Sequence, residues 1–182
     1  VGELARVEGI AVRLGLVVRV ALRVNPDIDA KSHPHISTGL RINKFGMPLD
    51  DVRGLFKTIG SRRSLKLVAI HVHIGSQITT IEPLARSAAL VADLVRELGA
   101  CGIVPEYVDL GGGLGISYDG RTVPTVEQYA TALVAAVAPT GLPIVIEPGR
   151  AIVGPSGTLL ARVIDLKLRN ADSQFAVLDA GM

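Results

Sequence analysis

Short aliphatic runs alternate along the chain with longer segments whose apolar residues recur at helical spacing, and this alternation limits the possible folds. We expect strands at residues 16–24, 65–73, 105–110 and 142–149. We expect helices at residues 3–14, 48–60, 81–100 and 125–138, the last with Thr125 as its N-cap. Strands that alternate with helices are typical of a parallel sheet covered by helices. Four such units make half of a (β/α)8 barrel, which needs about 250 residues.

Composition supports a buried sheet and narrows the function classes. The 182 residues are 48% hydrophobic but only 3% aromatic, which favours aliphatic strands buried on both faces. The net charge of +2 comes from interspersed signs, and no basic stripe indicates nucleic-acid binding. No apolar run approaches the ~18 residues of a membrane span. The one cysteine, Cys101, excludes an intramolecular disulfide, and we expect it to be a small packing residue in a reducing compartment.

The alternation of strands and helices ends after Gly149. Residues 157–170 and 173–182 are expected to form two strands joined by a polar turn, with no helix between them. The GPSG stretch at 154–157 marks a predicted domain boundary. We therefore expect a partial barrel at residues 1–153 and the start of a C-terminal β-domain at 154–182.

Two histidines end the strand at 65–73. His71 and His73 share one face of this strand because side chains alternate with a period of two. They can be core residues, one wall of a site, or a zinc pair, since imidazoles are common zinc ligands. A catalytic zinc needs a third ligand, and the only other histidines, His33 and His35, lie in the long loop at 25–47 without an acidic cluster. This loop also holds Lys44, for which a solvated position is expected.

Three consecutive glycines follow the strand at 105–110. Gly111, Gly112 and Gly113 leave backbone N–H groups open to close approach by an anion such as a phosphate. A tight turn that needs positive φ is the alternative interpretation. The spacing matches neither a dinucleotide fingerprint nor a P-loop.

The strand at 142–149 ends on an acidic side chain. Glu147 would be costly there unless it met a cation or a protonated heterocycle. Arg150 can pair with Glu147 directly. Alternatively, the two charges can be divided between a ring nitrogen and the phosphate held by the glycines.

Together these strand ends resemble those of the fold-type III pyridoxal-phosphate-dependent decarboxylases. The resemblance runs through the whole chain and is closest to the diaminopimelate branch of that family. It implies the second half of a (β/α)8 barrel followed by the first strands of a β-domain. The segments that carry it are RVNPDIDAKSHPHISTGLRINKFGM, HVHIGSQI, YVDLGGGLGISY, IEPGRAIVG and VLDAGM.

The resemblance also implies roles for individual residues. His73 would stack on the ring of pyridoxal phosphate, and Glu147 would pair with the pyridine nitrogen, so that the ring can accept electrons as CO2 leaves. Arg150 would contact the phosphate and also a substrate carboxylate. The other implied cofactor-binding residues are Ser76, Gly111, Gly112, Gly113, Pro148 and Gly149. His71 matches no catalytic position, so we expect it to pack or hydrogen-bond beneath the site, and no metal is expected.

Other residues that the family uses are not found in this sequence. The lysine that binds the cofactor covalently would precede Val1, and Lys44 does not match it. A substrate-binding arginine and tyrosine, and a cysteine segment that reaches the partner subunit, would follow Met182. We therefore expect an inactive internal segment of a longer enzyme.

That longer enzyme is expected to convert meso-diaminopimelate to L-lysine and CO2 as a cytoplasmic homodimer. Three alternatives stay open. The first is another decarboxylase of this fold, of the ornithine, arginine or carboxynorspermidine type. The others are a non-catalytic binding relative and a metal-dependent barrel hydrolase that uses His71 and His73.

Overall fold

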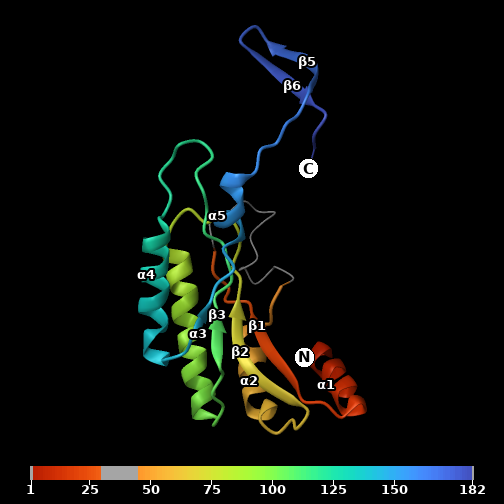
Figure 1. Cartoon of the computed structure of the whole chain (residues 1–182), viewed down its shortest axis with the longest axis vertical. Helices are drawn as coiled ribbons and strands as arrows, with labels where there is room; N and C mark the ends of the chain where they lie inside the picture. The colour runs from red at the N-terminus through yellow and green to blue at the C-terminus, as the bar shows by residue number, and fades with distance from the viewer. Residues whose placement is uncertain (1, 30–44, 182) are drawn as a thin grey trace.

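The computed structural model describes residues 2–29 and 45–181, and its larger part is a parallel sheet with helices (Figure 1). The four strands lie side by side in sequence order, β1-β2-β3-β4. The elements are α1 (Gly2–Leu14), β1 (Val18–Val24), α2 (Leu49–Ile59), β2 (Leu65–Val72), α3 (Glu82–Ala100), β3 (Tyr107–Asp109), α4 (Val126–Val137) and β4 (Ile144–Val145). This confirms the predicted α/β alternation. Lys44, His33 and His35 lie outside the described residues.

Local sequence signals set the helix boundaries. Thr125 caps α4 as predicted, since its side chain accepts the Gln128 N–H at 3.2 Å while the Gln128 side chain accepts the Thr125 N–H at 3.0 Å. The helix α2 begins directly after Pro48 and carries Asp50 and Asp51 in its first turn. Among the residues that the structure describes, no helix is both long and apolar enough to cross a membrane.

Most of the core lies on one face of the sheet. Ile70, Val72 and Val108 are buried in a continuous cluster with apolar residues of α2, α3 and α4, whereas the neighbouring His71 and Asp109 are only half-buried. The prediction of strands buried on both faces is confirmed only for the middle of β2, where the consecutive residues Leu67–Ile70 are all buried, whereas Arg19 and Ala21 of β1 are exposed. The exposed positions lie on the face of the sheet that the helices of this cluster do not cover.

The predicted buried strand at 142–149 is also shorter and more exposed than expected. β4 contains only Ile144 and Val145, and the exposed fractions of Val145 and Ile146 are 40% and 43%. β4 is the outer strand of the sheet, so its far side has no strand to pack against in the described chain. An aliphatic run alone does not ensure burial at a sheet edge.

The C-terminal part forms an antiparallel hairpin, which lies apart from the sheet in Figure 1. The strands β5 (Val163–Asn170) and β6 (Ser173–Leu178) confirm the predicted pair and its polar turn, although β5 begins six residues later than expected. Every residue of both strands is exposed. Before the hairpin, a short helix α5 (Gly149–Val153) and a 3-10 turn η2 (Gly154–Ser156) were not predicted.

Cys101 differs from its predicted role. The residue is exposed and caps the C-terminus of α3, where its N–H donates to the carbonyl oxygen of Leu98. Gly102 follows with a φ of +74° and turns the chain away from the helix. The prediction of a packed thiol is therefore wrong.

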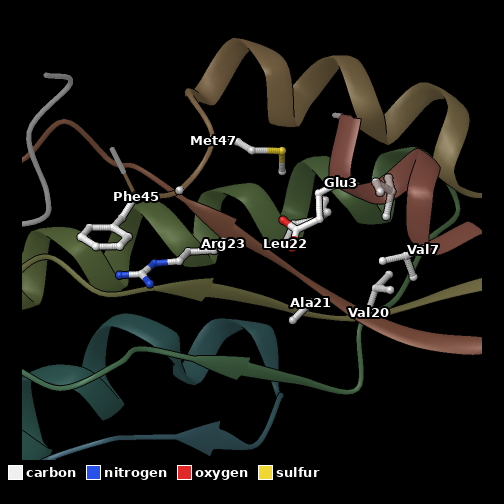
Figure 2. A pocket seen from close by; sticks show the side chains of 10 residues that line it. Glu3, Val7, Val20, Ala21, Leu22, Arg23, Phe45 and Met47 are labelled. Carbon is white, nitrogen blue, oxygen red and sulfur yellow. The ribbon is translucent and has the colours of Figure 1, made fainter. Parts of the chain in front are cut away.

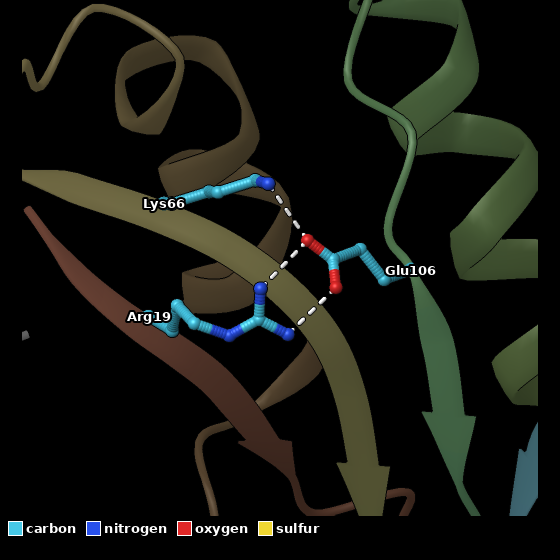
Figure 3. A network of polar contacts seen from close by, with 3 residues as sticks. All are labelled: Arg19, Lys66 and Glu106. Carbon is cyan, nitrogen blue, oxygen red and sulfur yellow. Dashed lines mark hydrogen bonds and ion pairs between the residues drawn. The ribbon is translucent and has the colours of Figure 1, made fainter.

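A charged cluster joins the strands near their amino ends (Figure 3). Arg19 in β1 donates two hydrogen bonds to the carboxylate of Glu106, at 2.9 and 2.6 Å, and the Lys66 ammonium of β2 lies 2.7 Å from the same carboxylate. Arg19 and Lys66 are paired in register, so both cations reach the residue that precedes β3. Hydrogen bonds from Arg19 and then Lys66 lower the pKa of Glu106 from 4.5 to about 2.

Arg19→Met is expected to raise the pKa of Glu106 toward 4.5, because the main cause of its depression is removed. A depressed carboxylate pKa stabilises the fold above the unfolded pKa, and this contribution is lost as pH falls from 4.5 toward 2. NMR titration of the Glu106 carboxyl carbon measures the change. Arg86→Met, which removes a cation that pairs with Glu82 in α3, is the matched control and should leave Glu106 unchanged.

Candidate functional site

The strand register brings the predicted residues to one edge of the sheet. Arg23 of β1 pairs with His71 of β2, His71 pairs with Asp109 of β3, and Asp109 pairs with Val145 of β4. In parallel strands, register partners lie next to each other on the same face. The next residues along the strands then bring His73, Gly111 and Glu147 together at the carboxyl ends.

Both histidines approach Glu147. The Nε2 atom of His71 lies 3.9 Å from Glu147 Oε2, and the Nδ1 atom of His73 lies 3.6 Å from the same oxygen. Burial is the main cause that lowers the pKa of each imidazole, and Arg23 lowers both further. The nearby carboxylates oppose this effect but do not reverse it. Both rings are therefore neutral near pH 7, and Glu147 faces imidazoles that carry no charge.

The glycines make close backbone contacts with neighbouring strands. A Cβ at Gly111 would lie 2.3 Å from the Val72 carbonyl oxygen, and one at Gly112 would lie 2.1 Å from that of Glu147. Gly111 and Gly113 have positive φ values of +65° and +111°. The turn interpretation therefore holds for these two positions, and the close packing requires glycine at Gly112 as well.

The amides of the glycines differ in their availability to a ligand. The Gly111 N–H donates to Asp109 Oδ1 at 2.9 Å, and the Gly112 N–H donates to His73 Nδ1 at 3.2 Å. In the described part of the chain, no acceptor meets the Gly113 N–H. Phosphate binding by these amides stays a prediction, with Gly113 as the donor that remains available.

Arg150 is directed away from Glu147. Its Nε donates to Ser76 Oγ at 3.2 Å, and its Nη1 donates to the Tyr118 hydroxyl at 2.6 Å. The ion pairs of the described residues do not include Arg150 with Glu147. The direct pairing considered from the sequence is therefore not formed, and the two charges stay separate.

No role was predicted from the sequence for three residues at this edge. Asp109 accepts the N–H of Gly111, and the Tyr118 hydroxyl accepts a hydrogen bond from Arg150. Gln77 joins two loops, because its side-chain amide accepts the Ile116 N–H and donates to the Ile116 carbonyl oxygen. Asp109 has a readable signal, since it ends a strand like Glu147. The contact of Tyr118 with Arg150 spans 32 residues and has no local signal.

Three side chains at this edge lie close enough together to be considered as metal ligands. A ring nitrogen of His71 and carboxylate oxygens of Asp109 and Glu147 all lie within 4.8 Å of one another. The sequence argument against a metal considered only histidines from the long loop as the third ligand. It therefore overlooked two carboxylates that the sheet register supplies.

A sizeable groove in the described part of the chain lies away from this cluster. A groove of about 540 Å³ runs between α1 and β1, with Glu3 and Val7 on one side and Val20 and Arg23 on the other (Figure 2). The Arg23 guanidinium lies 5.1 Å from the centre of the Phe45 ring, at one end of the groove. β1 is the other outer strand of the sheet, so the groove marks its open edge.

Comparison with known proteins decides the family. Residues 1–154 match the family model described as the pyridoxal binding domain of pyridoxal-dependent decarboxylases. The chain belongs to this family. The finding confirms the resemblance and the cofactor class that the sequence predicted.

Several relatives are diaminopimelate decarboxylases. The chain is 43% identical to that of Neisseria meningitidis serogroup A over 180 residues, which are 99% of this chain and 44% of the relative. The Helicobacter pylori enzyme complexed with L-lysine matches with a TM-score of 0.89 and 39% identity, over 99% of this chain and 45% of that chain. The M. jannaschii enzyme in co-complex with L-lysine matches with a TM-score of 0.82 and 36% identity, over 100% of this chain and 43% of that chain. The chain thus spans less than half the length of these relatives.

The cluster suits the cofactor of the family. A phosphate needs donors, and Arg150, the Ser76 hydroxyl and the Gly113 amide supply them on neighbouring loops. A pyridinium nitrogen needs an anion, and the half-exposed carboxylate of Glu147 supplies it. The positions that would crowd these loops with a Cβ are glycines.

Gly112→Ala is expected to lower the free energy of unfolding by about 1–3 kcal/mol, because the new methyl group collides with the carbonyl of Glu147. Gly99→Ala in α3 is the control. A Cβ added at Gly99 would meet no atom within 4 Å beyond its chain neighbours and the backbone of its own helix, so this change should raise the free energy of unfolding by about 0.5–1 kcal/mol. Urea unfolding followed by circular dichroism measures both, and equal effects would contradict the proposed crowding at Gly112.

Proposed function

We propose that this segment forms the cofactor-binding strand ends of a diaminopimelate decarboxylase, which converts meso-diaminopimelate to L-lysine and CO2 on pyridoxal phosphate. In this proposal, a full-length enzyme that carries the segment has the activity. The identity of about 40% to diaminopimelate decarboxylases over nearly the whole chain supports this substrate over those of other decarboxylases.

One observation carries the proposal: the two charges of the Glu-Pro-Gly-Arg stretch are separated. In the described residues, Glu147 meets two imidazoles and no lysine or arginine. Arg150 is held by two neutral hydroxyl groups, and its Nη2 has no partner in this part of the chain. An anion without a cation and a cation without an anion are suited to a ligand that carries both charges. Pyridoxal phosphate is such a ligand, with its ring nitrogen and its phosphate.

Each residue then has a chemical task. When bound, pyridoxal phosphate supplies an electron sink for the carbanion that remains after CO2 departs. Glu147 holds the proton on the ring nitrogen and so keeps that sink effective. Arg150, the Ser76 hydroxyl and the Gly113 N–H bind the phosphate, while Gly111 and Gly112 keep the loops close. His73 faces the ring, and Pro148 and Gly149 turn the chain between Glu147 and Arg150.

We further propose the domain division predicted from the sequence, with a partial barrel at 1–153 and a β-domain that begins at 154–182. The family model ends at residue 154, and the exposed hairpin makes no buried contact with the sheet, which supports this division. The full-length enzyme is proposed to be a cytoplasmic homodimer, like the longer enzyme expected from the sequence. Arg150 is also proposed to contact a carboxylate of the substrate in the same site.

Glu147→Gln in the full-length enzyme is expected to weaken pyridoxal phosphate binding, to keep the cofactor bound when it is saturating, and to lower kcat by at least about 100-fold. The neutral amide no longer holds a proton on the ring nitrogen, so the electron sink is weakened. Visible absorbance shows whether the cofactor is bound, and CO2 release from meso-diaminopimelate gives kcat. A wild-type protein that retains no cofactor absorbance after unbound pyridoxal phosphate has been removed would contradict the proposed function, as would an unchanged kcat in the variant.

Ser76→Ala is expected to weaken pyridoxal phosphate binding about tenfold, since a hydroxyl that donates to a phosphate is lost and Arg150 loses a partner. Fluorescence titration of the cofactor-free enzyme measures the dissociation constant. Ser87→Ala is the matched control, because Ser87 is buried in α3 and its hydroxyl has no partner in the described structure. Similar dissociation constants for both variants would argue against a phosphate contact at Ser76.

A further inference from the structure

His71 holds an unexplained polar atom beside the proposed site. Its Nε2 is buried and has no hydrogen-bond partner among the described residues. A buried polar nitrogen without a partner destabilises a fold, so such an atom in a native protein calls for an explanation. The groups around His71 are Arg23 from β1, Asp109 from β3, Glu147 after β4 and His73 on its own strand.

Glu147 is the acceptor that can meet this nitrogen. The 3.9 Å between His71 Nε2 and Glu147 Oε2 is about 1 Å longer than a hydrogen bond. The side chain of Glu147 is 49% exposed, and the terminal torsion of a glutamate turns freely. A small rotation of the carboxylate therefore closes the gap without moving the backbone.

His73 is less suited to this role, although it lies closer to Glu147. Its Nδ1, the atom that faces the carboxylate, accepts the Gly112 N–H at 3.2 Å. In a neutral imidazole, a nitrogen that accepts a hydrogen bond carries no proton. While His73 Nδ1 accepts this N–H it carries no hydrogen for Glu147, so donation from His73 to Glu147 competes with the Gly112 contact, whereas His71 Nε2 has no such competing contact in the described residues.

We propose that His71 is a positioning residue, whose neutral Nε2–H donates to one oxygen of Glu147 and aims the other oxygen at the pyridine nitrogen of the cofactor. A neutral donor orients the carboxylate and leaves its negative charge intact. Arg23 and Asp109 flank His71 in the register row. This inference rests on the proposed function and adds a role that the resemblance does not give to His71.

A double-mutant cycle in the full-length enzyme tests the role. His71→Met removes the donor at similar volume and is expected to weaken pyridoxal phosphate binding about tenfold. His71→Gln places an amide N–H near the position of Nε2 and is expected to stay within about threefold of wild type. In the Glu147→Gln background, His71→Met should change the dissociation constant less than about twofold, because the carboxylate it positions is gone. Titration of cofactor-free enzyme with pyridoxal phosphate gives all values.

The outcomes separate this inference from the proposed function. Equal effects of His71→Met with and without Glu147 would overturn it, because a packing role does not depend on that carboxylate. Equal losses in His71→Met and His71→Gln would also overturn it. A wild-type enzyme that binds no pyridoxal phosphate would overturn the proposed function and this inference together, whereas binding with additive effects would overturn this inference alone.

Discussion

The parallel pairing of β1, β2 and β3 decides which side chains can meet at the site. A register shift of one residue would exchange the faces of every side chain on a strand. The observed register places Arg23, His71 and Asp109 side by side on the face that the helices leave open. The apolar partners on the other face, such as Ile70 and Val108, fix that register through the buried core. The site therefore depends on packing that occurs on the opposite side of the sheet.

Close contact between the backbones of the loops that follow β3 and β4 continues the strand pairing beyond the strands. The N–H of Glu147 donates to the carbonyl oxygen of Gly111 at 2.7 Å, so the pairing of β3 with β4 continues into the loops. The contact is possible because Gly112 has no side chain to separate the two chains. His73 Nδ1 and Glu147 Oε2 are thereby held 3.6 Å apart, although the two residues follow different strands. The glycines are therefore needed for the close packing of the backbone, in addition to any role in ligand binding.

The extent to which the sequence predicted this structure depends on the range of the interactions. Helix boundaries follow local rules, so Thr125 and Pro48 marked α4 and α2 correctly. The strand-end rule likewise located His73, the glycines and Glu147 at one edge. Burial depends on neighbours that a sequence does not show, which explains the errors at Val145 and Cys101. The short helix α5 was missed because Pro148 and Gly149 were assigned to the end of the strand expected at 142–149.

Two glutamates at opposite ends of the strands show how the fold treats charge. Glu106, at the amino ends, is bound by two cations and has little capacity left for a ligand. Glu147, at the carboxyl ends, has two imidazoles whose burial lowers their pKa values and keeps them uncharged. A lysine or arginine at either histidine position would neutralise Glu147 and compete with a cationic ring nitrogen. In the proposed arrangement, the neutral His71 fixes the direction of the carboxylate and leaves its charge for the cofactor, which gives a physical reason for histidine at this position.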